Sequence, residues 1–144
     1  MKPYPHHYSV SAEMRGDAPV RLSAPGLPDL ESAPPVEFDG PGDRWSPETL
    51  LLGAVADCFL LTFRAVARAS KLEWKEVRAH AEGTLDRAEG GARFTAVRLR
   101  AELELPAGGD AATGERLLAK AERSCLISRS LVCPVELEPT VRTG

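Results

Sequence analysis

Residues 8–23 contain two short runs in which hydrophobic and polar side chains alternate. Residues 8–14 alternate strictly, a turn sequence follows at 16–19, and residues 20–23 can return beside the first run. Alternation with a period of two is typical of a strand with one buried face, so we expect a β-hairpin here. Residues 24–43 contain five of the twelve prolines and three glycines, which predicts an ordered loop without regular structure.

Three later runs alternate in the same way, at residues 77–85, 97–105 and 135–141. The first two are separated by a turn sequence at 86–91, and Gly83 favours a β-bulge in the first. A proline inside the last run places it at the edge of a sheet. Charges of both signs line the polar side of the middle run, which indicates a solvated face with cross-strand pairs.

The longest helical pattern runs from Ser46 to Ser70. Ser46 can cap the first turn, Pro47 suits the first helical position, and Glu48 favours the positive end of the helix dipole. Between residues 50 and 63 apolar side chains occur on every side of the helical wheel, which predicts a helix buried all round. A membrane span is not expected, because Asp57 interrupts the apolar run and basic residues follow it closely.

A second helix is expected to begin at Asp110 and run towards Cys125 and Ile127, with one buried face. Strands, a long helix, strands, a second helix and a last strand predict a single α+β domain over residues 1–144. Its antiparallel sheet would cover one side of the helices. Because the long helix is too apolar to be covered by its own sheet alone, we expect a symmetric homodimer that buries the rest.

Composition and charge exclude two classes of binding partner for the protein, nucleic acids and membrane surfaces. The net charge is −3, with acidic and basic residues interspersed, so neither a nucleic-acid footprint nor a polybasic membrane patch is expected. The amino terminus lacks the apolar segment of a secretory signal, which predicts a cytoplasmic protein. Cysteines in such a compartment are kept reduced, so a catalytic or redox role is more plausible for them than a permanent disulfide framework.

Taken one at a time, Cys58, Cys125 and Cys133 are each explained as small buried hydrophobic residues. Their spacing does not match a zinc site, and His6 and His7 lie in a terminus without a pattern. No metal and no bound cofactor are therefore expected.

Two segments together give a more specific indication. SPETLLLGAVADCFLLTF, which contains Glu48 and Cys58, and AERSCLISRSL, which contains Cys125, closely resemble the two signatures of the OsmC/Ohr superfamily of osmotically inducible and organic hydroperoxide resistance proteins. The order of strands and helices is also similar over nearly the whole chain. The resemblance implies an OsmC-like fold, an intertwined homodimer with two thiol sites built from both subunits, and a peroxiredoxin-like reduction of organic hydroperoxides.

The resemblance also implies roles for individual residues. Cys58 matches the peroxidatic cysteine and Cys125 the resolving one, while Glu48 matches a glutamate at the start of the helix. The arginine of the family falls by spacing on Arg15, with Arg21 as the alternative. An arginine suits this site because it stays charged and offers several donors to a thiolate and a peroxide oxygen, and a glutamate can orient it through a bidentate pair.

The expected reaction leaves a sulfenic acid on Cys58, which Cys125 converts to a disulfide. An external dithiol reopens the disulfide by exchange, and the resemblance implies a lipoyl-type reductant. The chain departs from the peroxidase signature at Leu126, where those branches resemble Cys-Pro, so the substrate and the role of Cys133 stay open. The alternative is a non-catalytic dimeric module that binds a small apolar ligand and merely packs its cysteines.

Overall fold

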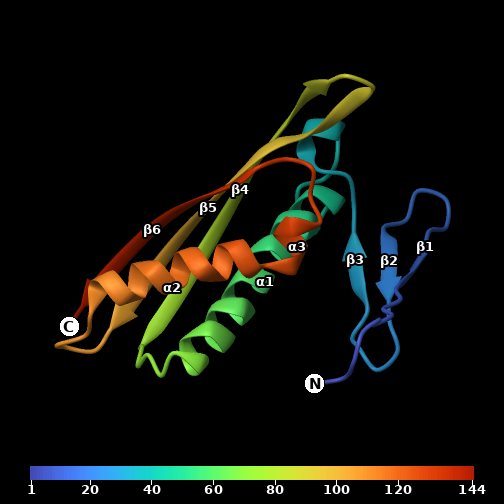
Figure 1. Cartoon of the computed structure of the whole chain (residues 1–144). Helices are drawn as coiled ribbons and strands as arrows, with labels where there is room; N and C mark the ends of the chain where they lie inside the picture. The colour runs from blue at the N-terminus through green and yellow to red at the C-terminus, as the bar shows by residue number, and fades with distance from the viewer. The chain divides into compact units, whose positions relative to one another are not determined.

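The computed structural model describes all residues from Met1 to Gly144. Its internal contacts divide the chain into two compact units, Met1–Leu50 and Leu51–Gly144, whose elements are shown in Figure 1. The long helix α1 begins at the end of the first unit and continues into the second. That the chain forms one domain stays a prediction.

The first unit contains a small antiparallel sheet with strand order β1-β2-β3. Strands β1 (Ser11–Glu13) and β2 (Val20–Ser23) confirm the predicted hairpin, although β1 is shorter than the alternating run. The predicted loop at 24–43 is wrong in part, because it contains strand β3 (Leu30–Ser32) and the 3-10 helix η1 (Val36–Phe38). Three residues between prolines are enough to pair with β2, which supplies the neighbouring backbone groups.

Helix α1 (Pro47–Ala69) confirms the predicted helix and its cap. The Ser46 hydroxyl oxygen accepts a hydrogen bond from the backbone N–H of Thr49 at 3.2 Å, and the backbone N–H of Ser46 donates to the Thr49 hydroxyl at 2.9 Å. This reciprocal pair satisfies two donors that the helix itself cannot pair.

The expectation that α1 is buried on every side is not met within one chain. Its fully buried residues recur every four positions, at Val55, Phe59, Phe63 and Ala67, while Leu61 on another side is 49% exposed. The most apolar 18-residue window of α1 has a mean hydropathy of 1.9, enough for a membrane span by length and composition, and 28% of that window is buried. The four buried residues form the packing face of a core helix, and a second copy covering the rest stays a prediction.

The second unit contains a three-stranded sheet in the order β4-β5-β6. Strands β4 (Glu76–Ala88) and β5 (Gly91–Leu105) are antiparallel and reach further than expected, so that only Glu89 and Gly90 remain in the predicted turn. The register shifts between Thr84 and Leu85, one position after the bulge predicted at Gly83, and leaves Thr95 of β5 unpaired.

Strand β6 (Val135–Thr143) lies at the edge of this sheet, as its proline predicted. It pairs with β5 in parallel, from Val97 opposite Val135 to Leu105 opposite Thr143, which corrects the expectation of a wholly antiparallel sheet. The cause is the chain path between the strands. After β5 the helix α2 runs back across the sheet, so that β6 starts at the same end as β5, and parallel strands need such a crossover.

Two helices follow β5. Helix α2 (Ala111–Ser124) is capped as predicted by Asp110, whose carboxylate accepts from the backbone N–H of Ala112 at 3.0 Å. The single turn α3 (Leu126–Arg129) comes directly after it. Cys125 is therefore not late within one helix, as expected, but lies at the junction of two.

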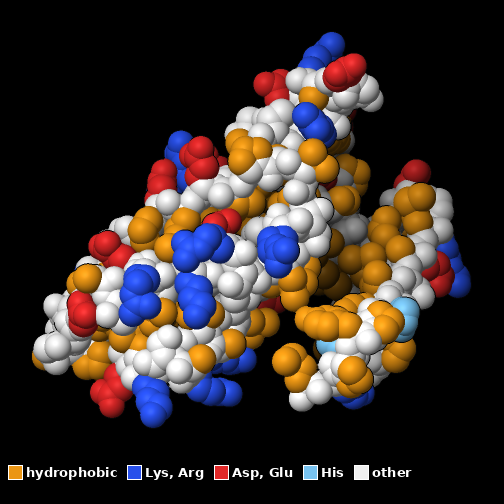
Figure 2. Space-filling view, in the orientation of Figure 1, with side chains coloured by type: hydrophobic (Ala, Val, Ile, Leu, Met, Phe, Trp, Pro, Cys, Tyr) orange, Lys and Arg blue, Asp and Glu red, His pale blue; other side chains and the backbone are white.

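One hydrophobic core joins α1, β5 and α2 in the second unit. Its fully or almost fully buried members are Phe59, Phe63, Ala67, Leu99, Ala101, Leu103, Leu105, Leu117, Leu118 and Ala121. Basic side chains gather over the outward face of α2 in Figure 2, as expected for a helix with a single buried face. This core fixes α1 and the α2–α3 junction within one packed unit, and these two elements carry Cys58 and Cys125.

Candidate active site

Cys58 lies near the middle of α1 and is half-buried. Its neighbour in the sequence, Phe59, points into the core, so the sulfur lies at the margin of the packed face. The Sγ atom lies 3.9 Å from the hydroxyl oxygen of Thr62, one turn later on the same helix. Cys58 is thus partly accessible and has a polar side chain beside it.

Cys125 is fully buried at the point where the chain leaves α2. Its backbone is extended, with φ −67° and ψ 110°, which ends α2 and starts α3. The backbone N–H of Arg129 donates to the Cys125 carbonyl at 3.0 Å, and the hydroxyl of Ser128 donates to the Cys125 sulfur at 3.4 Å. Two residues of α3 therefore form hydrogen bonds with Cys125, the residue that precedes this helix.

The structure makes Cys58 and Cys125 neighbours. Burial, the largest influence, raises the pKa of the Cys125 thiol, while hydrogen bonds from the hydroxyl and backbone of Ser128 lower it. The Cys58 thiol raises this pKa further, an influence that acts only at short range. Cys58 and Leu126, the residue after Cys125, also line one hollow of the second unit. Two thiols that are far apart in the sequence therefore lie near each other.

A shallow hollow of about 520 Å³ opens beside Cys58. Its lining is Ala54, Asp57, Cys58, Leu61, Thr62, Ala65, Leu126 and Ile127. Most of these side chains are apolar, and Leu126 of α3 is 63% exposed at the wall of the hollow. Asp57 is exposed rather than buried, so it does not place an uncompensated carboxylate inside the core.

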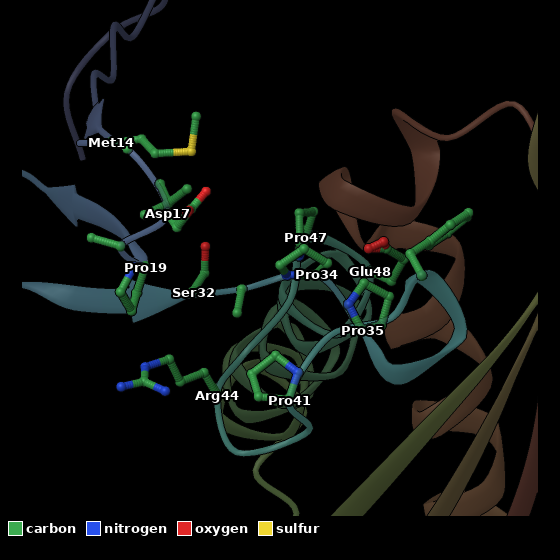
Figure 3. Close-up of a pocket in the computed structure, with 15 residues that line it drawn as sticks. Met14, Asp17, Pro19, Ser32, Pro34, Pro35, Pro41, Arg44, Pro47 and Glu48 are labelled. Atoms are coloured by element: carbon green, nitrogen blue, oxygen red, sulfur yellow. The ribbon is translucent and has the colours of Figure 1, made fainter.

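Glu48 lies in the first turn of α1, in the first unit, and has an unusual carboxylate. Its Oε1 atom is buried and has no hydrogen-bond partner. Glu48 also lines a groove of about 870 Å³ formed by the loops before α1, and the Arg44 guanidinium on the same groove is directed away from it (Figure 3). Burying a carboxylate oxygen without a hydrogen-bond donor costs free energy. A positively charged side chain could therefore pair with this atom.

The arginines expected to meet Glu48 pair elsewhere in the single chain. Arg15 donates to Glu13 at 2.8 Å and its side chain is 84% exposed. Arg21 lies 3.7 Å from Glu13 and 3.8 Å from Asp29, with its side chain 54% exposed. These are surface pairs, which contribute little to stability, so neither arginine is held firmly in place.

Cys133 is half-buried, precedes β6 and is not among the residues that line the hollow. No group of three or more His, Cys, Asp and Glu side chains is placed to hold a metal ion. The thiol pair is therefore the main chemical feature of the second unit.

Two polar residues beside the thiols were given no role in the sequence analysis. Thr62 follows Cys58 by four positions and Ser128 follows Cys125 by three. Side chains four positions apart lie on the same face of a helix, so Thr62 could have been found from its spacing. The contact of Ser128 with Cys125 depends on the break between α2 and α3, which the sequence did not indicate. Leu126 was singled out only as a departure from a signature, and the structure adds that it lines the hollow.

Comparisons with known proteins identify the family of this chain. The sequence profile of the family described as "OsmC-like protein" matches residues 40–140. The uncharacterised protein YmaD of Bacillus subtilis is 32% identical over 96% of this chain and 97% of its own length. Peroxiredoxin OsmC of Escherichia coli is 27% identical over 65% of this chain and 64% of its own.

A solved structure supports the same assignment. The organic hydroperoxide resistance protein OsmC of Legionella pneumophila superposes with a TM-score of 0.75 and 28% identity, covering 95% of this chain and 98% of that one. The predicted α+β fold of OsmC type is thereby confirmed. The matched profile covers more than half of the sequence and includes both Cys58 and Cys125, and the chain belongs to the OsmC-like protein family.

Proposed function

We propose that this protein is a thiol-dependent peroxidase that reduces organic hydroperoxides. The observation that carries the proposal is the proximity of the Cys58 and Cys125 thiols beside an apolar hollow. Relatives named peroxiredoxin and organic hydroperoxide resistance protein support the reaction class.

The two thiols suit successive steps. The half-buried Cys58 is accessible to a peroxide, and its thiolate attacks the terminal oxygen, so that the O–O bond breaks and an alcohol leaves after protonation. The product is a sulfenic acid on Cys58. The buried Cys125 then attacks that sulfur, the S–O bond breaks, and water is released as the disulfide forms. An external dithiol, of lipoyl type in the proposal, reduces the disulfide by exchange.

Glu48 is proposed to hold the cation that keeps the Cys58 thiolate charged. Its unpaired oxygen supports this role, and Arg15 is the proposed partner with Arg21 as the alternative. The proposal includes a homodimer in which the Glu48–arginine pair of one subunit serves Cys58 of the other.

The hollow suggests the class of peroxide. Its walls include the apolar side chains of Leu61, Leu126 and Ile127. An alkyl chain bound there would remove apolar surface of these side chains from water, which favours binding. Hydrogen peroxide has no apolar surface to bury there. We therefore propose alkyl or aryl hydroperoxides as the preferred oxidants.

The Cys125→Ser variant separates the first step from the second. After one equivalent of cumene hydroperoxide we expect its Cys58 to remain as a sulfenic acid, because no thiol is present to condense with it. Dimedone labelling followed by mass spectrometry measures this adduct, and wild-type protein under the same conditions should give little. If Cys58 stays a free thiol while the hydroperoxide remains unconsumed, the peroxidase proposal fails and the apolar-ligand module is favoured.

A further inference from the structure

Ser128 uses its hydroxyl group in an unusual way for a helical serine. Serine in a helix commonly donates to a backbone carbonyl one turn earlier, and Ser130 does so, with its hydroxyl 2.8 Å from the Leu126 carbonyl oxygen. The Ser128 hydroxyl instead donates to the Cys125 sulfur at 3.4 Å. Two serines two positions apart in the chain therefore have different partners, and only Ser128 contacts a thiol.

The geometry of the α2–α3 junction produces this contact. The extended backbone of Cys125 ends α2, and α3 starts at the next residue. One turn of helix then returns Ser128 to the side of Cys125, where the serine is only 8% exposed and the cysteine is fully buried. Water has little access to the sulfur, so the hydroxyl is a main source of a hydrogen bond for it.

The resolving step needs such a donor. A thiol attacks a sulfenic acid as its thiolate, and burial opposes formation of that anion. A hydroxyl already directed at the sulfur stabilises the anion at the moment it forms, and hydrogen bonds to a charged group are stronger than those between neutral groups. The S–S bond forms as the S–O bond breaks, the departing hydroxide and the proton lost by Cys125 together make up one water, and Ser128 keeps its own proton throughout.

We propose that Ser128 is a positioning residue that holds the Cys125 sulfur and stabilises its thiolate during disulfide formation; its place in turnover rests on the proposed peroxidase function. The side chain is not among the residues that line the hollow beside Cys58, so it is not expected to contact the peroxide. It acts through Cys125 alone.

Other groups near Cys125 do not replace this donor. Cys58 on α1 raises the pKa of Cys125 and so opposes its ionisation. Asp57 beside Cys58 is exposed and negative, and the flanking side chains of Arg123 and Arg129 are also exposed to solvent. The Ser128 hydroxyl and backbone are the groups that lower the pKa of Cys125.

A titration tests the contact without relying on catalysis. In a Cys58→Ser, Cys133→Ser background, absorbance of the thiolate near 240 nm follows ionisation of Cys125 alone. We expect Ser128→Ala to raise the titration midpoint, and the matched control Ser130→Ala to leave it unchanged. Ser128→Thr keeps a hydroxyl and should restore the lower midpoint. Equal midpoints for Ser128→Ala and the parent would overturn the proposal, and Ser128→Gly provides a second hydroxyl-free variant if the alanine protein does not fold.

A single-turnover experiment tests the consequence. With all cysteines present, Ser128→Ala should form the Cys58–Cys125 disulfide about tenfold more slowly at pH 7, with the difference shrinking as pH rises and the thiolate forms without help. The rate of Cys58 oxidation should not change. An unchanged rate of disulfide formation contradicts the role of Ser128. Failure of Cys58 to oxidise in any variant contradicts the peroxidase function instead, and the titration still decides the role of Ser128.

Discussion

Replacing Cys58 with serine should reduce dithiol-driven turnover of cumene hydroperoxide to the uncatalysed background. A serine hydroxyl is far less acidic and less nucleophilic than a thiol, and no other group of the hollow can attack the peroxide oxygen. The effect should exceed a thousandfold, as is typical when a nucleophile is removed. Consumption of the hydroperoxide with dithiothreitol as reductant measures it.

Cys133→Ser is the matched control for this loss. It removes one thiol of the same kind from a half-buried position outside the lining of the hollow, so turnover should stay close to that of the wild type. Circular dichroism of both variants checks that the fold is kept. Undiminished turnover by Cys58→Ser would mean that the reaction occurs elsewhere.

Replacing Phe63 with alanine should lower the free energy of unfolding by about 3–5 kcal/mol. Phe63 is fully buried on the packed face of α1 and meets the ring of Trp74 edge to face, with 5.7 Å between ring centroids. The change leaves a cavity between α1 and the sheet and removes the aromatic contact. Urea denaturation followed by tryptophan fluorescence or circular dichroism gives the free energy.

Phe38→Ala removes the same atoms from a residue that is 58% exposed. Its cost should be less than about 1 kcal/mol, because little apolar surface returns to water. If the two variants were equally destabilised, the core would not be centred on the packed face of α1.

Local signals predicted the helices well. Ser46 and Asp110 cap α1 and α2 through contacts with residues two or three positions away, and such contacts can be inferred from a short window of sequence. The short β3 was missed because its pairing with β2 depends on a partner outside that window. The parallel direction of β6 depends on the path of α2 across the sheet, which alternation within the strand does not reveal.

The burial of α1 shows a second limit of prediction from the hydrophobic pattern. Its apolar residues on every side predicted a fully buried helix, but one chain covers only the face that contains Phe59 and Phe63. Apolar positions along a helix indicate burial by its own chain and burial by another subunit alike. The pattern alone does not show which of the two covers a given side. A second copy of the chain remains the proposed cover for the uncovered side.

Some residues of the candidate site could be predicted from the sequence and others could not. Spacing alone left Cys58 and Cys125 as ordinary buried residues, and family resemblance joined them into a pair. The structure adds that the thiols lie near each other and that Ser128 donates to one of them. The serine contact depends on the break between α2 and α3. The arginine stays a prediction, because Arg15 and Arg21 meet other carboxylates in the single chain while Glu48 keeps an unpaired oxygen.

The most direct measurement is non-reducing peptide mapping after one equivalent of organic hydroperoxide. The account predicts rapid appearance of a peptide pair joined by a Cys58–Cys125 disulfide, with Cys133 still free. A protein that consumes no hydroperoxide and yields only free cysteines, or one that joins Cys58 to a different residue, would contradict it.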